Sequence, residues 1–280
     1  MTTIRSSYAP RIRPVARPTV LAVTFLDGAS VVALVRAAEL ARALDAELVV
    51  LYAITTDWAS DLGALMSAQI LGAARTIARA WCEDVLGDWR PSPSVVVGHG
   101  DVLETVGRVA DDCDAGLIVL GDHAHPGAVD FDGAATAVTF VRQAGRPALV
   151  ARVRGALRGI VAATDFSDES FPALRHAARL GAKTHVPITF LHNTQTTHPD
   201  GRARYEDDLR RLAGIVGLDA ESVVTERPDH ADAIVGVASE RHADLIIVGA
   251  RLRDRTKPLG TATRVARNAP QSVLVVPLAP

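Results

Sequence analysis

With 280 residues, the chain exceeds the usual size of one domain, about 100 to 150 residues, and length alone favours two domains. Hydrophobic residues make up 48% of it but aromatic ones only 4%, so the core must be aliphatic, which suits buried strands covered by helices. The net charge of -2 and the pI near 6.5 give no sign of the strongly basic face that nucleic-acid or anionic-membrane binding needs.

The first predicted segment, residues 1–18, is an arm that carries arginines and prolines, and no acidic residue precedes Asp27. Such a composition is typical of a disordered tail. The arm lacks the apolar core of a signal peptide, and no apolar run approaches the roughly 18 residues of a spanning helix. Cys82 and Cys113 stand in no metal-ligand spacing. We therefore expect a cytoplasmic protein with no membrane segment and no disulfide framework.

The rest of the chain contains one pattern twice. Leu21–Thr24 matches Val161–Thr164, and the register holds without a gap through the strand around Leu48–Leu51, which falls on Ile188–Leu191. Two later blocks also recur, with smaller offsets: Leu117–Gly121 matches Leu245–Gly249, and Pro147–Val150 matches Ser272–Val275. The sequence therefore predicts two domains of similar fold, residues 19–153 and 157–280.

The second copy shows its elements most clearly. A strand over 159–164 is followed by Ser167–Ser170, any of which can cap a helix, and by a buried helical stripe of Leu174, Ala177, Ala178 and Gly181. Further strands are predicted over 186–191, 222–225, 245–248 and 272–276, and further helices over 201–215, 231–241 and 261–268.

Alternating strands and helices predict the fold class: α/β, with two tandem doubly wound domains, each a parallel sheet with helices on both faces. Ligands of such sheets bind at the carboxyl ends of the strands, where the strand order reverses. The end of the first strand and the loop after the fourth are therefore the places to search for a site.

Those places carry a family pattern. The runs Val161–Ser170, Ala173–Ala182, Ala243–Gly249 and Gly260–Val276 closely resemble the universal stress protein family. The resemblance covers residues 158–278, and more faintly 19–152. It implies five strands per domain in the order 3-2-1-4-5, with dimer-like pairing through the last strand. In ATP-binding members, an Asp at the end of the first strand lies near the base and ribose, and a loop patterned G-x2-G-x9-G-[ST] holds the phosphates.

Carried over residue by residue, the resemblance implies an adenine-nucleotide site in the second copy, with magnesium only as it accompanies the nucleotide. Asp165, Gly249, Gly260 and Thr261 match the motif itself. The predicted site comprises Thr164, Asp165, Asn193, Gly249, Ala250, Arg251, Gly260, Thr261 and Ala262.

The phosphate loop departs from the family pattern. Leu252 stands at the second glycine, and Gly249 to Gly260 spans 11 positions where the pattern needs 13. A side chain at that turn obstructs a left-handed backbone, and the short loop cannot curl around a triphosphate in the usual way. The basic side chains of the loop offer an alternative phosphate contact, or form a solvated basic loop. They are Arg251, Arg253, Arg255 and Lys257.

The first copy departs further, because Phe25 replaces the Asp and Ala124 and Ala135 replace loop glycines. Three loop carboxylates, Asp122, Asp130 and Asp132, would repel phosphate. This half is therefore structural, or binds something other than ATP. A metal site made with His123 and His125 is one alternative, although its spacing matches no established ligand motif.

Two further groups of residues have two interpretations each. His192 and Asn193 follow the second strand of the second copy, where they either contact the ligand or only close the strand. The tryptophans of the first copy, Trp58, Trp81 and Trp89, are predicted to pack against the fold rather than to bind a ligand.

The sequence contains no catalytic motif for acyl transfer, metallohydrolysis or P-loop chemistry, so we expect no enzymatic activity beyond slow, incidental ATP hydrolysis.

The leading hypothesis is a cytoplasmic stress-response protein whose second domain binds an adenine nucleotide, ATP or AMP, weakly or in altered fashion. The first domain then supports an internal pseudo-dimer, with neither nucleic acid nor membrane as partner. The alternative is a nucleotide-independent scaffold or a sensor of another small ligand. Whether two chains also form a homodimer stays open.

Overall fold

The computed structural model describes residues 17–54, 64–122, 133–195, 199–250 and 260–277. Strands and helices alternate along both copies. The strands are β1 Thr19–Thr24, β2 Glu47–Ile54, β3 Ser94–His99, β4 Ala115–Gly121, β5 Ala148–Ala151, β6 Ile160–Ala163, β7 Ile188–Asn193, β8 Glu221–Thr225, β9 Leu245–Ala250 and β10 Ser272–Pro277. The helices are α1 Gly28–Leu44, α2 Ala64–Leu86, α3 Val102–Asp112, α4 Gly133–Ala144, α5 Phe171–Thr184, α6 Pro199–Ile215, α7 His230–Glu240 and α8 Thr261–Asn268, and a short 3-10 turn over Asp168–Ser170 precedes α5.

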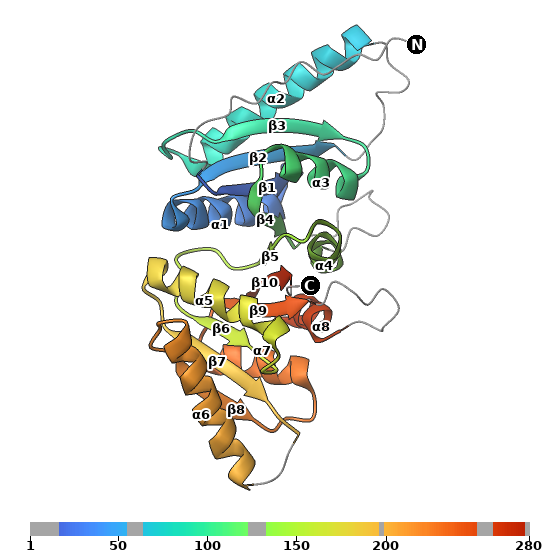
Figure 1. Cartoon of the computed structure of the whole chain (residues 1–280). Helices are drawn as coiled ribbons and strands as arrows, with labels where there is room; N and C mark the ends of the chain where they lie inside the picture. Colours follow the sequence, from blue (N-terminus) through green and yellow to red (C-terminus); the bar gives the residue numbers. More distant parts are fainter. Residues whose placement is uncertain (1–16, 55–63, 123–132, 196–198, 251–259, 278–280) are drawn as a thin grey trace.

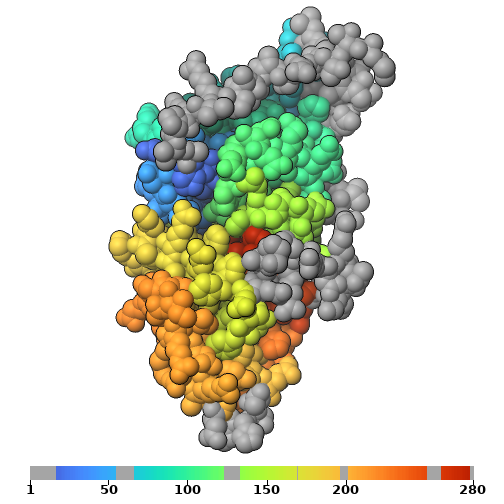
Figure 2. Space-filling view, in the orientation of Figure 1, coloured from blue at the N-terminus to red at the C-terminus, as the bar shows by residue number. Residues whose placement is uncertain are grey.

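The strands form one ten-stranded sheet in the order β3-β2-β1-β4-β5-β10-β9-β6-β7-β8 (Figure 1). Each copy therefore has the strand order 3-2-1-4-5, and the prediction of a doubly wound α/β fold is confirmed. All neighbours are parallel except β5 and β10, which pair antiparallel with Leu149 opposite Leu274. The pairing of the last strands joins the two copies end to end, and the space-filling view shows them stacked along one long axis (Figure 2).

Two layers of core lie on the two faces of the sheet. The strands are apolar on both sides: Ile246 belongs to the core layer that also contains buried residues of α3, α4, α7 and α8, whereas its neighbour Ile247 belongs to the layer that contains those of α1, α2, α5 and α6. The predicted stripe on α5 is buried, and Gly181 within it lets the helix lie directly on Ile188, whose side chain would collide with any Cβ there. Among the described helices, none has the length and apolar character needed to cross a bilayer.

Predicted element bounds in the second copy differ little from those observed, and the differences have local causes. The strand predicted from residue 186 begins at Ile188, because Pro187 has no N–H to donate and instead accepts a hydrogen bond from the Ile160 N–H (3.0 Å). Ser167 does act as a cap, since its Oγ accepts from the Ser170 N–H at 3.2 Å. That bond closes the 3-10 turn that leads into α5.

The predicted arm, residues 1–18, lies outside the described residues up to position 16. Its last residue is part of the fold, because the Pro18 carbonyl accepts a hydrogen bond from the Glu47 N–H at 2.8 Å. Pro18 therefore belongs to the fold and not to a disordered arm.

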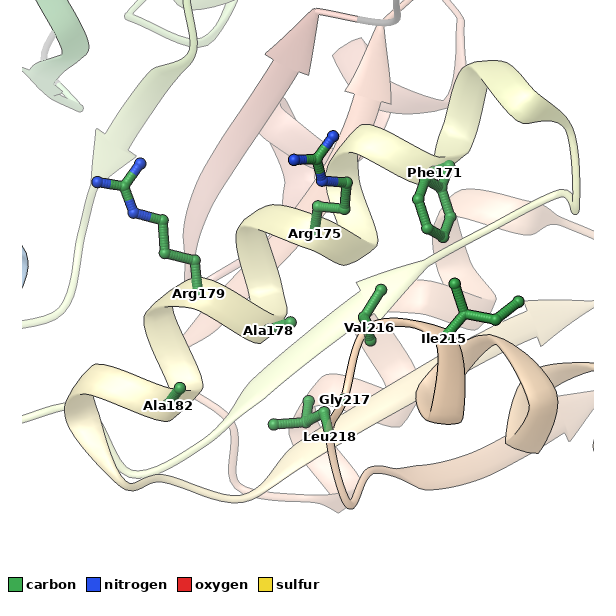
Figure 3. A pocket seen from close by; sticks show the side chains of 9 residues that line it. All are labelled: Phe171, Arg175, Ala178, Arg179, Ala182, Ile215, Val216, Gly217 and Leu218. Carbon is green, nitrogen blue, oxygen red and sulfur yellow. The ribbon is translucent and has the colours of Figure 1, made fainter.

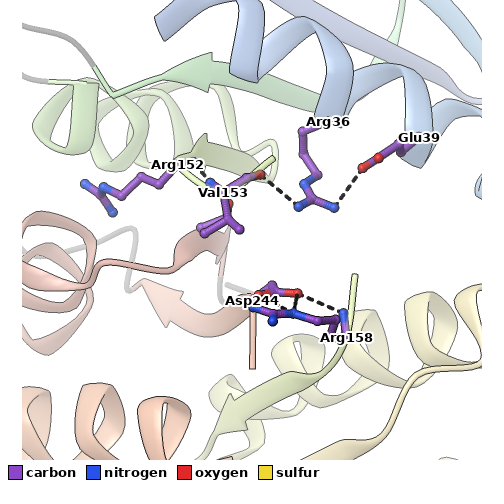
Figure 4. Close-up of polar contacts among 7 residues, drawn as sticks. Arg36, Glu39, Arg152, Val153, Arg158 and Asp244 are labelled. Atoms are coloured by element: carbon purple, nitrogen blue, oxygen red, sulfur yellow. Dashed lines mark hydrogen bonds and ion pairs between the residues drawn. The ribbon is translucent and has the colours of Figure 1, made fainter. Parts of the chain in front are cut away.

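The connection between the copies is held by charged groups at both ends (Figure 4). Arg36, buried on α1, donates to the Val153 carbonyl at 2.9 Å and to Glu39 Oε2 at 2.8 Å. At the other end, Asp244 accepts from the Arg158 backbone N–H (2.9 Å) and from its guanidinium (2.7 Å), and this hydrogen bonding lowers the pKa of the Asp244 carboxyl. The linker between the two domains is thus fastened to both of them.

Acid should weaken the fold through His176 on α5. Burial lowers the pKa of His176, and Arg175 and Arg179 lower it further. Because its pKa in the folded state lies below that in the unfolded state, its contribution is complete above about pH 6.5 and is lost as pH falls below that value. Urea unfolding at pH 7.5 and 5.5 should show a loss of stability that shrinks, by at most about 1.4 kcal/mol per pH unit, in His176→Gln. An unchanged loss in that variant would contradict the assignment.

Candidate functional site

A tight turn after β6 carries the predicted aspartate. Phe166 takes a left-handed backbone conformation (φ 62°), which is held because its N–H donates to Thr164 Oγ1 at 3.0 Å. Ser170 Oγ donates to the Ser167 carbonyl, so the 2.7 Å bond between Ser170 and Thr164 must be donated by the threonine hydroxyl. The predicted site residue Thr164 is therefore buried with its hydroxyl used in shaping the turn.

The same turn orients Asp165. Its Oδ1 accepts from the Ser167 N–H at 3.1 Å and from Ser167 Oγ at 2.5 Å, while the residue itself is exposed. These bonds hold a carboxylate at the carboxyl end of the first strand of the copy, where a ligand of a doubly wound sheet would meet it.

Asn193, at the end of β7, uses its side-chain amide entirely in hydrogen bonds to other residues of the chain. Its Nδ2 donates to the Arg227 carbonyl (3.0 Å) and to His230 Nδ1 (2.9 Å), and its Oδ1 accepts from Thr225 Oγ1 (2.8 Å) and the Arg227 N–H (3.0 Å). Two donors and two acceptor positions exhaust a carboxamide. Asn193 therefore positions the connection between β8 and α7, beside the predicted site.

His192 lies on the other face of the sheet. Its Nδ1 donates to the Thr164 carbonyl at 2.9 Å, and its ring packs against Phe166 and Tyr205, with centroids 4.5 and 4.7 Å away. Burial lowers the pKa of His192. The ring thus closes the strand on the α5 and α6 side. The sequence offered no signal for Tyr205, because only the packing of α6 brings it there.

The N-terminus of α8 has no side-chain cap. Asp27, Asp101 and Asp229 each cap their helices with a carboxylate, but Gly260 leads into α8 without one. A Cβ placed on Gly260 would meet no atom of the described residues within 4 Å, so no described side chain covers this position. Uncapped N–H groups and the helix dipole together favour an anion, above all a phosphate.

Two arginines hold α8 in place. Arg152, just after β5, donates from Nη2 to the Ala266 carbonyl (2.5 Å), from Nη1 to the Gln271 carbonyl (3.4 Å) and from Nε to Asp122 Oδ2 (2.7 Å). Its side chain is only 9% exposed. It therefore ties the last turn of α8 to the start of the first copy's loop, a contact for which the sequence held no sign.

The second arginine joins α8 to its neighbour α7. Arg264 forms an ion pair with Asp229, the carboxylate that caps α7, and this hydrogen bond lowers the pKa of Asp229. The helix that presents the uncapped N-terminus is thus anchored to α7 as well as to the first copy.

Comparison with known sequences decides the family. The model described as universal stress protein family matches residues 17–152 and again residues 157–277. The chain belongs to the universal stress protein family. No curated protein was found to match the sequence.

Two solved structures of universal stress proteins share the fold of nearly the whole chain, and a third matches less than half of it. One from Archaeoglobus fulgidus DSM 4304 is 16% identical with a TM-score of 0.70, covering 92% of this chain and 98% of its own. A putative universal stress protein from Pseudomonas aeruginosa UCBPP-PA14 is 19% identical with a TM-score of 0.65, covering 94% of each chain. An Archaeoglobus fulgidus universal stress protein in complex with dAMP is 24% identical over 44% of this chain and 98% of its own, with a TM-score of 0.36.

In the first domain of this universal stress protein, two described positions differ from their counterparts in the second domain. Phe25, aligned with Asp165, is buried in the core between the sheet and α4. The first residue of α4, Gly133, lies so close to β4 that a Cβ there would be 2.6 Å from the Gly121 carbonyl. The substitution of Phe25 for the aspartate is thus accompanied by a close approach of α4 to β4.

The remaining predicted positions divide between described and undescribed residues. Gly249 and Ala250 end β9, Gly260 and Thr261 are exposed, and Ala262 lies on the buried face of α8. Arg251 lies outside the described residues, with the rest of its loop (Leu252, Arg253, Arg255 and Lys257), as do the candidate metal ligands His123, His125, Asp130 and Asp132, and Trp58.

Three residues of the first domain that the sequence singled out, Asp122, Trp81 and Trp89, have described contacts. Asp122, the remaining candidate metal ligand, is paired with Arg152. Within the described ranges, no group of three or more metal-ligating side chains comes together. Trp81 and Trp89 pack against the core, as predicted.

Proposed function

We propose that this universal stress protein binds an adenine nucleotide in its second domain, with the phosphates at the N-terminus of α8 and the base and ribose beside Asp165. The observation that carries the proposal is the N-terminus of α8 at Gly260, for which the described residues provide no side-chain cap; α1, α3 and α7 are capped by carboxylates, and α5, which also lacks a cap, follows a 3-10 turn. The site would be used for binding rather than turnover, with magnesium only as the nucleotide's counter-ion.

In this proposal the two domains have different roles: the second binds the ligand and the first serves as its structural partner. The second keeps an open anion site, while Phe25 and the close approach of α4 fill the corresponding place in the first. We assign the first domain the role of a partner subunit, since its β5 pairs with β10 and its linker is fastened by Arg36. In this proposal the protein acts in the cytoplasmic stress response as an internal pseudo-dimer.

Calorimetric titration with ATP, AMP and cyclic AMP tests the proposal. Wild-type protein should release heat on binding at least one of them, and Asp165→Ala should weaken that binding by about tenfold, the effect of losing one hydrogen bond to a charged group. Asp168→Ala, which removes an exposed carboxylate three residues away, is the matched control and should bind as wild type does.

Three outcomes would contradict parts of the proposal. The absence of heat at millimolar nucleotide would leave a nucleotide-independent scaffold, the function that Leu252 and the shortened loop favour. Nucleotide binding by Asp165→Ala as tight as that of wild type would show that the base does not lie at this turn. Sustained phosphate release from ATP would instead contradict a binding role without turnover.

A further inference from the structure

A groove of about 490 Å³ lies on the other side of the sheet, between α5 and the turn that follows α6 (Figure 3). Phe171, Arg175, Ala178 and Ala182 recur at helical spacing on α5 and form one wall. Residues 215–218 form the facing wall, where Ile215 is 69% exposed. The groove falls within the size range of small-molecule sites, roughly 300 to 1,000 Å³.

The first domain closes the same place with its own tryptophan. The repeat sets Arg42 of α1 at the position of Ala182, and the Arg42 guanidinium lies 4.3 Å from the ring centroid of Trp89. Trp89 also packs against the core layer beneath α1 and α2. An indole ring thus covers the end of α1 that corresponds to the open end of the groove.

The second domain lacks that tryptophan because its turn is shorter. A glycine with positive φ ends each long helix, Gly87 in the first copy and Gly217 in the second. Residues 88–93 then precede β3, whereas only residues 218–220 precede β8. The three missing positions remove the indole, and Ala182 removes the arginine that stacked on it. An aromatic-sized space is left over an apolar floor.

Arg175 and Arg179 add positive charge to this space. They lie one helical turn apart on α5, line the groove and are exposed, and Figure 3 shows both side chains running outward from α5, away from residues 215–218. No hydrogen bond or ion pair within the described part of the chain involves either guanidinium, and no acidic residue lines the groove. Arginine recognises carboxylate and phosphate through paired N–H donors and also stacks on aromatic rings.

We propose that the groove between α5 and residues 215–218 binds a small aromatic anion, with its ring where the first domain places Trp89 and its carboxylate on Arg175 and Arg179. This site is separate from the proposed nucleotide site, since it lies on the α5 and α6 face of the sheet and α8 lies on the other. It would make the second domain responsive to a second class of small molecule.

Indole-3-acetate is the probe that tests the proposal on the full-length chain, by saturation-transfer NMR and calorimetry in the presence of saturating AMP. The protein should bind indole-3-acetate. It should bind indole, which lacks the carboxylate, and acetate, which lacks the aromatic ring, at least about tenfold more weakly. The double variant Arg175→Ala/Arg179→Ala should lose at least about tenfold in affinity. The control Arg204→Ala/Arg211→Ala removes the same charge from α6 and should bind as wild type does.

A variant that fills the groove without changing its charge tests whether the shape of the groove is needed for binding of the probe. Ala182→Trp, at an exposed helical position, should abolish binding of the probe while leaving thermal unfolding and nucleotide titration unchanged. Equal affinity for indole and indole-3-acetate, or unchanged affinity in the Arg175 and Arg179 double variant, would overturn the proposal. Absence of probe binding would also overturn the proposal. If sedimentation then showed a dimer of the chain that Ala182→Trp disrupts, the occupant of the groove would be a second copy of the protein.

Discussion

Replacing Gly260 with aspartate should abolish nucleotide binding and leave the domain at least as stable as before. Gly260 has extended backbone angles (φ -65°, ψ 169°) and open space around its Cβ position, so the new side chain fits and can accept from the free N–H groups of α8. A bound phosphate would meet a carboxylate about 4 Å away, a repulsion of about 4 kcal/mol at an effective dielectric constant of 20. Calorimetry should show at least about a hundredfold weaker binding.

Gly260→Asn is the matched control. Asparagine caps a helix about as well as aspartate but carries no charge, so it should weaken binding far less while stabilising α8 similarly. If both variants bind nucleotide as tightly as wild type, the phosphates do not lie at this helix end. If both lose binding equally, steric closure rather than charge decides the site.

Arg152→Ala should destabilise α8 and remove its hydrogen-bonded link to the first domain. The substitution removes hydrogen bonds from a buried guanidinium to the Ala266 and Gln271 carbonyls and to Asp122. Hydrogen bonds of charged groups are worth about 1.5 to 3 kcal/mol each, and a partly exposed Asp122 is rehydrated, so we expect a net loss of about 2 to 4 kcal/mol in the free energy of unfolding. Urea denaturation measures it.

Hydrogen exchange distinguishes this local role from a general loss of stability. Amides of α8 should lose protection in Arg152→Ala more than amides of α7 do, and nucleotide affinity should fall with them. Arg154→Ala, two residues on and exposed, should change neither. Uniform loss of protection across the second domain would show that Arg152 acts on the whole fold and not on α8.

Local and repeated patterns account for what could be predicted from sequence. The repeat indicated two copies, the alternation of strands and helices indicated parallel sheets, and the stripe on α5 indicated its buried face. Asp165, Gly260 and Thr261 could be placed because each directly follows a strand or opens a helix, where short-range rules hold. Asn193 was placed correctly at the strand end, but its four hydrogen bonds to the β8–α7 connection could not be inferred, because their partners lie more than 30 residues away.

The sequence by itself determined the duplicated α/β architecture and the retention of a carboxylate and a helix-start glycine in the second copy, because backbone propensity and apolar periodicity are local properties. Only the tertiary structure decided that α8 opens without a cap while α4 is packed against Gly121, that Arg152 joins the two domains, and that a shortened turn leaves a groove where Trp89 lies in the first copy. Each of these depends on distant segments meeting across a sheet, and burial and charge pairing at such meetings are set by packing rather than by neighbouring residues.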